Sequence, residues 1–505
     1  MGSPYKMETP HRSSSDIISN LPDQVMETIL AHLPIRDAIK TSLLSNKWRY
    51  KWNFIPTLVF HEQHTSFPTN PKAFLSNKLV NFVNRVLLHH NGSIEKFELY
   101  IHSLQGYVID SWILFLSKNG VKEIVLMFWT RDRYEVHSSF FSFEAICSLY
   151  LCRCILKPPP MFKGFSYLKS LNLESVALAD EVFESMISSC TALEILTLMH
   201  LEGCHRIKIS GLNLKRFYFD GEFVDISFID APHLSFVSIT LNDNVVDKFV
   251  RQGGISNLVR VLGCLTALEK LVIHHCFMQF LAMGNLLKRF PVAYDRLKTI
   301  SLYINFNDMK QSLAMLCLFQ SSPNLQELGV EAAIDDAAEC VEDFWKAQRS
   351  LYCSMNHLCM FLVMGNLPKR LPVSVAYDCL KSISLYINFK DLKQSLVMLC
   401  LFQRAPNLQE LEMEVGVEDA IEYVEDFWKA QSGLNCFMNH LRVVKISMLG
   451  AQPELEFIEF LLANSPVLEI LSVDHFSEKK VEESRVLKEL MRFRRASAKA
   501  EIEYN

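Results

Sequence analysis

The hydrophobic and polar positions of the chain follow one pattern from residue 94 to residue 473. An apolar residue is followed by two variable positions, a second apolar residue, one variable position and a third apolar residue. Apolar and polar residues alternate at the end of the pattern, which predicts a short β-strand with one buried face. Most starts lie 20 to 29 residues apart. The pattern begins at Ile94, Val121, Ile146, Leu168, Leu193, Leu214, Leu234, Leu268, Leu297, Leu325, Leu358, Leu380, Leu408, Leu441 and Leu468.

The segments between the predicted strands have the spacing of helices. In 341–351 and 391–403, apolar residues recur every three or four positions. Pro323 and Pro406 end the helix before the next strand. A strand, a helix, a break and another strand form a right-handed parallel crossover. The prediction is therefore an α/β leucine-rich-repeat solenoid over 94–440, a parallel β-sheet horseshoe with helices on the convex side.

A coarser repeat lies inside this solenoid. Residues 280–358 and 361–441 are near copies, since SLYINF at 301–306 returns at 384–389 and VEDFWKAQ and MNHL also recur. A repeat architecture tolerates such an insertion because each repeat contacts only its neighbours. The sequence leaves two explanations open, a duplication that lengthens the protein or an error in the gene prediction.

Residues 16–60 differ from the repeats and predict three short helices. Pro22 suits the first turn of a helix, and apolar residues follow at helical spacing until Pro34 ends it. A second helix is expected over 36–44, and a third around two tryptophans. About 40 residues are too few for an independent core, so the module needs a neighbour, and exposed apolar residues here suggest a partner. Residues 1–15 precede it and are expected to be a disordered, solvated tail.

The module contains, in order, two Leu-Pro pairs, a Leu-Ser pair, a Trp-Arg pair and a final Trp. In this order they resemble the F-box of plant proteins, from which Gln24 and Asn46 are small departures. The resemblance implies docking on a Skp-type adaptor, which links to a cullin and a RING protein. The residues expected to contact the adaptor are Leu21, Pro22, Val25, Ile29, Leu30, Leu33, Pro34, Leu43, Leu44, Trp48 and Trp52.

Residues 441–505 form a third region. The segments HLRVVKISML, LEFIEFLLANSPVLEILSV and MRFRRASAKAEIEY resemble the FBD domain of plant F-box proteins. The residues themselves predict an amphipathic helix over 455–462, a last strand over 468–473 and a basic helix over 481–495. That helix is expected to cap the open end of the solenoid, because end repeats need a polar cover.

Composition narrows the classes of protein that the chain can be. The formal net charge of −5 gives no basic field that would favour nucleic acid. No apolar run approaches the ~20 residues that cross a bilayer, and the first residues lack the apolar core of a signal peptide. We expect an intracellular protein, in the nucleus, the cytoplasm or both, that binds neither nucleic acid nor membrane.

Candidate chemistry is scarce. The 14 cysteines include no CxxC pair, which favours buried thiols over a metal site. No nucleophile elbow, phosphate loop or zinc-protease motif occurs, so the chain is expected to be non-catalytic and without a cofactor. The resemblances imply the substrate-recognition subunit of an SCF-type E3 ubiquitin ligase. An interaction scaffold and a ligand-sensing receptor without a degradative role remain alternatives.

The protein target is expected to bind the outward side of the strands, at positions five and seven of each pattern. Acids outnumber bases there, and Lys445 is the evident cation. We hypothesise an acidic, tyrosine-bearing concave face that prefers a basic segment of a partner; solvated residues with no partner are the alternative. The candidates are Glu174, Tyr218, Asp220, Tyr303, Glu331, Tyr386, Glu412 and Glu414.

Overall fold

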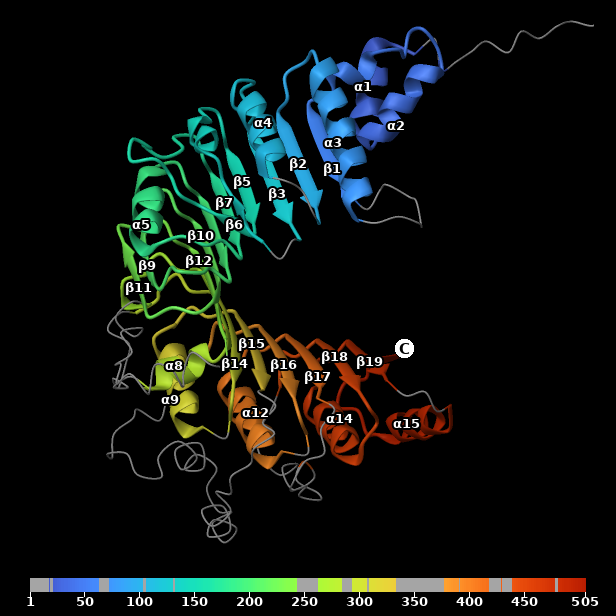
Figure 1. Cartoon of the computed structure of the whole chain (residues 1–505). Coiled ribbons are helices and arrows are strands. Elements are labelled where there is room, and N and C mark those ends of the chain that lie inside the picture. The colour runs from blue at the N-terminus through green and yellow to red at the C-terminus, as the bar shows by residue number, and fades with distance from the viewer. Residues whose placement is uncertain are drawn as a thin grey trace, which may run out of the picture. The chain divides into compact units, whose positions relative to one another are not determined.

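Parallel strands with helices packed against one face make up most of the protein (Figure 1). The chain divides into two compact units, residues 1–193 and 194–505. The predicted α/β class with a large parallel sheet is confirmed in both units. The computed structural model describes residues 18, 21–62, 72–102, 106–129, 132–242, 262–283, 293–306, 308–332, 377–389, 391–416, 428, 438–476 and 480–505.

The first unit joins a small helical module to a sheet of order β1-β2-β3-β5-β7. The module holds α1 (Asp23–Ala31), α2 (Ile35–Lys40) and the 3-10 helices η1 (Thr41–Leu43) and η2 (Lys51–Phe54). The rest is β1 (Thr57–His61), α3 (Lys72–His89), β2 (Lys96–Ile101), α4 (Gly106–Ser117), β3 (Glu123–Phe128), β4 (Tyr134–Glu135), η4 (Ser138–Ser142), β5 (Ser148–Cys152), β6 (Cys154–Ile155), β7 (Ser170–Glu174) and α5 (Asp180–Ser189).

The two Leu-Pro pairs begin the helices of the module. Pro22 caps α1, and its carbonyl oxygen accepts hydrogen bonds from the amides of Val25 (3.0 Å) and Met26 (3.1 Å). Pro34 caps α2 in the same way, as expected of a residue with a fixed φ and no amide hydrogen. The third helix is shorter than predicted: η2 contains Trp52, whereas Trp48 lies in the turn before it.

The module rests on the first strands and on α3. The amides of Asn91 and Gly92 donate to the carbonyl oxygen of Asn53 at 2.9 and 3.2 Å. A Cβ on Gly92 would lie 3.0 Å from the Cα of Phe54, so only glycine permits this approach without a shift. The Arg36 guanidinium lies 4.9 Å from the ring centre of Phe82 on α3. The module therefore packs against the rest of the first unit.

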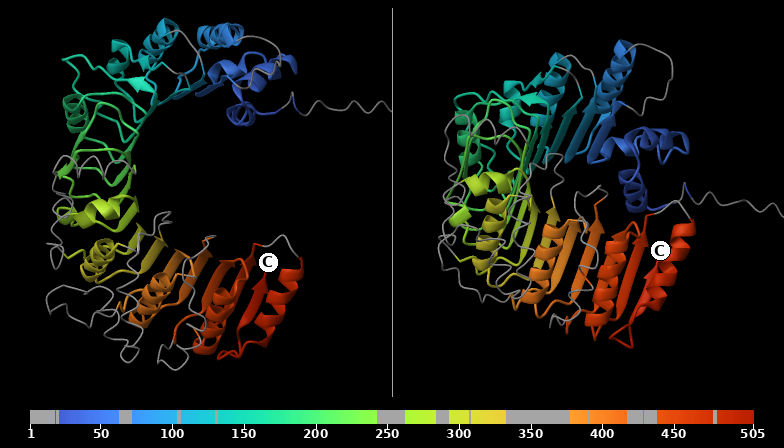
Figure 2. Two further views of the ribbon diagram at one scale, coloured as in Figure 1. Left: turned by 60° about the horizontal axis from the view of Figure 1, so that its bottom comes forward. Right: turned by 90° about the horizontal axis from the view of Figure 1, so that it is seen from below.

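The second unit is built around a parallel sheet of order β8-β10-β12-β13-β14-β15-β16-β17-β18-β19-β20. Helices α8, α9, α12 and α14 cover one face of it (Figure 2). Its elements are β8 (Ile195–Met199), β9 (Arg206–Ser210), β10 (Arg216–Gly221), β11 (Asp225–Ile229), β12 (Phe236–Leu241), β13 (Lys270–His275), α8 (Phe277–Met283), β14 (Thr299–Ile304), α9 (Met309–Gln320), β15 (Glu327–Ala332), β16 (Ser382–Ile387), α12 (Leu392–Arg404), β17 (Glu410–Val415), β18 (Val443–Met448), α14 (Gln452–Asn464), β19 (Ile470–His475), α15 (Lys480–Arg492) and β20 (Glu501–Tyr504).

The strands begin where the hydrophobic pattern places them. Each described start is followed two residues later by a strand, from β2 after Ile94 to β19 after Leu468. Within a strand such as β14, every second side chain is buried. The predicted strand at Leu358 lies outside the described residues. The pattern missed the end strands β1 and β20 and the short pairs β4–β6 and β9–β11.

The near copies found in the sequence fold alike where they are described. Asn324 and Asn407, at equivalent positions, each donate from Nδ2 to a backbone carbonyl at 2.8 Å. Gln311 and Gln394 each accept from a backbone amide with Oε1, at 3.0 and 2.8 Å. Each copy contributes two neighbouring strands, β14 with β15 and β16 with β17. Among the described helices of the protein, none has the length and hydrophobicity to span a bilayer.

Candidate functional site

The helical module exposes an apolar surface. Val25 and Ile29 lie one turn apart on α1 and are both exposed, and Leu43 and Leu44 are 88% and 57% exposed at the end of η1. Large aliphatic side chains left in water are typical of a surface that a partner covers. We call Val25, Ile29, Leu43 and Leu44 the apolar surface of the module.

Other residues predicted to contact the adaptor lie inside the module. Leu30, Trp48 and Trp52 are buried, and the Trp48 Nε1 donates to the Ile18 carbonyl oxygen at 3.2 Å. These three side chains pack inside the module, and their predicted contact with an adaptor stays a prediction. The remaining members are half-buried (Leu21, Leu33) or exposed (Pro22, Pro34).

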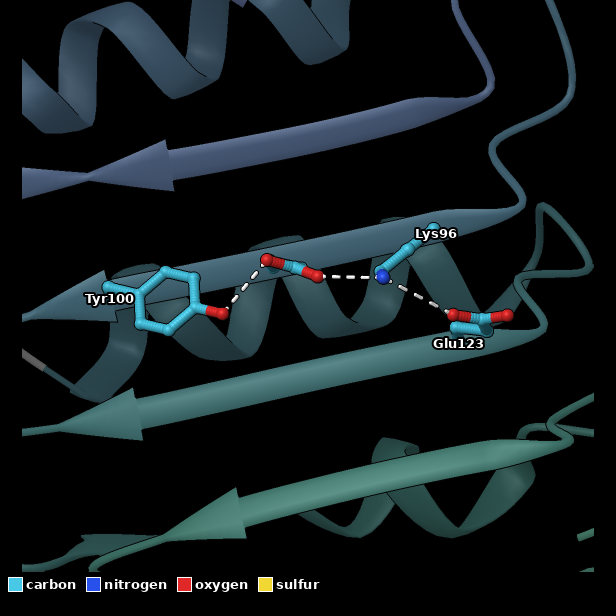
Figure 3. A network of polar contacts seen from close by, with 4 residues as sticks. Lys96, Tyr100 and Glu123 are labelled. Carbon is cyan, nitrogen blue, oxygen red and sulfur yellow. Dashed lines mark hydrogen bonds and ion pairs between the residues drawn. The ribbon is translucent and has the colours of Figure 1, made fainter. Parts of the chain in front are cut away.

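On the first unit's sheet, the polar side chains opposite the buried ones pair with one another (Figure 3). Lys96 Nζ lies 2.9 Å from a Glu98 carboxylate oxygen and 3.5 Å from one of Glu123, which raises the pKa of Lys96. The Tyr100 hydroxyl donates to Glu98 at 2.9 Å. Burial, and then this hydrogen bond, raise the pKa of Tyr100 to about 12.

Glu174, a predicted target-binding residue, belongs to the same type of network. The Tyr150 hydroxyl donates a hydrogen bond to its carboxylate, and burial raises the pKa of Tyr150 well above its usual value. A carboxylate that already accepts such a hydrogen bond gains less from an incoming cation. We therefore place Glu174 in the sheet's internal network.

The second unit brings five of the predicted residues together. Parallel pairing sets Tyr303 of β14 beside Glu331 of β15, Glu331 beside Tyr386 of β16, and Tyr386 beside Glu414 of β17. Glu412 lies on the same face of β17, two residues before Glu414. The three glutamates are exposed and the two tyrosines are half-buried. We call Tyr303, Glu331, Tyr386 and Glu414 the Tyr–Glu row.

Tyr218 and Asp220 lie elsewhere on this sheet, on β10. The Arg216 guanidinium donates to the Tyr218 hydroxyl and lies 5.3 Å from the centre of its ring. The sequence missed this cation because only positions five and seven of each pattern were taken as outward. Position three faces the same way, and it adds Lys96, Arg216 and Lys270. Lys445 remains the cation of positions five and seven, but the expectation left out the cations of position three.

The buried thiols are poor candidates for nucleophiles. Burial raises the pKa of Cys152 to about 11 and also raises the pKa of Cys154, Cys190 and Cys317. Each thiol is therefore protonated near pH 7, and a thiol reacts as its thiolate. Among the described residues, no three His, Cys, Asp or Glu side chains are grouped to bind a metal ion.

Comparison with known proteins identifies three regions. Residues 18–56 match the F-box domain, residues 109–330 match the LRR repeats of FBD-associated F-box protein At5g56370, and residues 431–473 match the FBD. None of the three is an enzyme family.

Two relatives from Arabidopsis thaliana extend the match. The F-box/FBD/LRR-repeat protein At1g13570 is 44% identical over 324 residues, which cover 63% of this chain and 77% of that protein. The F-box/LRR-repeat protein 13 is 24% identical over 509 residues, which cover 96% of both chains.

Proposed function

The chain belongs to the plant F-box/FBD/LRR-repeat family, and from that premise we propose that it is the substrate-recognition subunit of an SCF-type E3 ubiquitin ligase. F-box domains generally bind Skp-type adaptors in SCF complexes. The observation that carries the proposal is the apolar surface of the module, which lies within the matched F-box. Burying a fully exposed aliphatic side chain contributes about 1.5–3 kcal/mol, and Leu43, which is 88% exposed, is closest to that case.

The proposed mechanism is proximity. The module, within 16–60, binds the adaptor, and the adaptor links it to a cullin and a RING protein. The sheet of the repeats, within 94–440, holds the target, and the region 441–505 caps the open end of the repeats. Holding the target near the ubiquitin-charged enzyme raises its effective concentration without any chemistry by this chain.

The target would bind the Tyr–Glu row together with Glu412. Their carboxylates are exposed, and among the described residues no hydrogen bond or ion pair involves Glu331, Glu412 or Glu414. A basic segment of the target would neutralise the negative charge of these carboxylates. Tyrosine rings supply contact area at low cost in conformational entropy.

The test of adaptor binding uses the double variant Val25→Asp/Leu44→Asp. A buried carboxylate without a partner strongly disfavours the complex, so we expect capture of a purified Skp-type adaptor to fall at least about 100-fold. The fold should persist because both positions are exposed. Circular dichroism and a binding assay provide the two measurements.

The control is Leu88→Asp, at a leucine of α3 that is more exposed than Val25 and Leu44 and lies outside the module. It should leave adaptor capture unchanged. Capture that survives in the Val25→Asp/Leu44→Asp variant would refute the proposal.

A further inference from the structure

The Tyr–Glu row repeats with a period of two strands. The row runs across neighbouring strands as tyrosine, glutamate, tyrosine, glutamate. The cause is the repeat in the sequence, since each near copy contributes one tyrosine strand and one glutamate strand. A surface with two equivalent halves fits a ligand that also repeats.

The side chains beside the first three residues of the row are small. The neighbouring position on the first three strands holds Ser301, Gly329 and Ser384 in register. A Cβ on Gly329 would lie 3.0 Å from the Ser301 Oγ, so a larger side chain would crowd this band. Tyr303, Glu331 and Tyr386 therefore project next to small residues, which leaves room for a chain laid across these strands, whereas Glu414 has Glu412 beside it.

The spacing of the row decides the conformation of the ligand. Adjacent strands lie about 4.8 Å apart, so Glu331 and Glu414, two strands apart, are separated by ~9.6 Å. A polyproline II helix repeats every three residues at about 3.1 Å each, which gives ~9.3 Å on one face. Side chains on one face of an extended strand recur at about 6.8 Å and do not match.

Resting on the proposed function, we propose that the Tyr–Glu row binds a polyproline II segment of the target with Lys or Arg at every third residue. Each cation makes a charge-assisted hydrogen bond to Glu331 or Glu414. The ring of Tyr386 packs between the two cations and the ring of Tyr303 beside the one on Glu331, each against prolines or aliphatic stems, as aromatic side chains do in other grooves that recognise this helix. Because polyproline II is already ordered in a free proline-rich chain, little entropy is lost on binding.

The experiment measures the affinity of the full-length chain for three fluorescent peptides by anisotropy. Each has about twelve residues, three arginines and otherwise proline, with the arginines two, three or four residues apart, so that charge and helix type are constant. We expect the peptide with a spacing of three to bind at least about tenfold tighter than either isomer.

Variants locate the binding. Glu331→Gln and Glu414→Gln should each weaken the spacing-three peptide about three- to tenfold, and the double variant should abolish the preference for that spacing. Tyr386→Ser should weaken all three peptides. Circular dichroism of each variant checks that the sheet is intact.

The matched control is the double variant Glu327→Gln/Glu410→Gln. These exposed glutamates lie on the same two strands, and the same charge is removed about 13 Å along them. The control row has a serine, Ser382, in place of a tyrosine between its glutamates. The control should change the affinity less than about twofold.

Three results would overturn the inference: equal affinity for the three isomers, an equal loss in the control variant, or no binding of any peptide. The proposed function is tested separately by adaptor capture. If peptide binding fails while adaptor capture holds, only the inference fails; if adaptor capture fails while the peptide binds, the proposed function fails.

Discussion

Glutamates on the exposed side of the strands have two different environments in this protein. Glu98 accepts a hydrogen bond from Tyr100 and pairs with Lys96. Glu331 and Glu414 stand beside tyrosines that belong to other strands. No described residue makes a hydrogen bond or an ion pair with either carboxylate. The same side chain therefore takes part in contacts of the sheet in one unit, while in the other it has no partner among the described residues.

At the residue scale, Tyr100 should titrate at a higher pH than a free tyrosine. Its pKa is raised from the usual 10.0 to about 12, so folding favours the neutral phenol. This stabilisation is complete below pH 10 and is lost as the pH rises from 10 to about 12. In an absorbance titration of phenolate at 295 nm, the difference between wild type and Tyr100→Phe should have a midpoint near pH 12.

Glu98→Gln serves as the control for the cause. Burial is the larger contribution to the shift and the hydrogen bond to Glu98 is the second. The midpoint for Tyr100 in this variant should therefore fall but stay above 10. A Tyr100 midpoint near 10 in the wild type would show that the phenol is neither buried nor hydrogen-bonded as described.

At the scale of elements, α14 depends on one side chain at its N-terminus. The buried Glu454 accepts hydrogen bonds from the amides of Leu449 (3.0 Å), Gly450 (2.8 Å) and Ala451 (3.1 Å). Ala451, at the N-cap, has no side-chain acceptor of its own. The carboxylate thus satisfies the amides of the N-cap and of the two residues before it, and it lies at the positive end of the helix.

Replacing Glu454 with alanine should destabilise α14. Three amides would lose their acceptor, which costs about 2 kcal/mol and reduces hydrogen-exchange protection of 452–464 roughly 30-fold. Glu459→Ala, on the same helix and half-buried, is the control and should change protection less than about threefold. Equal protection in both variants would mean that the cap is not needed.

At the scale of the whole molecule, the near copies make the length of the repeat region adjustable. Removing residues 301–383 joins Ile300 to Ser384 and rebuilds the strand sequence TISLYI, which is identical to that of β14. Repeats contact only their neighbours, so the shortened chain should fold. Far-UV circular dichroism per residue should be unchanged, and the thermal transition should stay cooperative.

A deletion of 301–370 is the out-of-phase control. It removes fewer residues but joins Ile300 to LPVSV and rebuilds no repeat strand. We expect it to lose structure or aggregate, since an interrupted sheet exposes strand edges. If both deletions behave alike, the repeats are not independent units. The in-phase variant keeps one Tyr–Glu pair, Tyr386 and Glu414, and should lose the preference for arginines three residues apart.

Much of the fold was predictable because its rules are local. The alternation that begins at Leu468 predicts β19, and the Leu-Pro pairs predict the starts of α1 and α2. The end strand β20 was missed because its sequence, EIEY, is short and only half-buried, so the full repeat pattern is absent. Its place in the sheet comes from pairing with β19.

The candidate sites were less predictable. Trp48 and Val25 both match the F-box order, yet one is buried and the other exposed, because burial depends on how the helices pack together. Glu174 and Glu414 both follow the outward pattern, yet among the residues that the structure describes a tyrosine hydroxyl donates to Glu174 and none donates to Glu414. Such partners come from other repeats, and no local pattern specifies them.

By itself the sequence determined the class of fold, the positions of the repeat strands, the near copies and the family, since each depends on the order of residues within short segments. The tertiary structure decided which apolar residues of the module face outward, which glutamates are already paired, and that Tyr303, Glu331, Tyr386 and Glu414 form one row. The physical reason is register. Alternation fixes the face of the sheet on which each side chain lies. Hydrogen bonding between strands that are far apart in the sequence fixes which side chains become its neighbours.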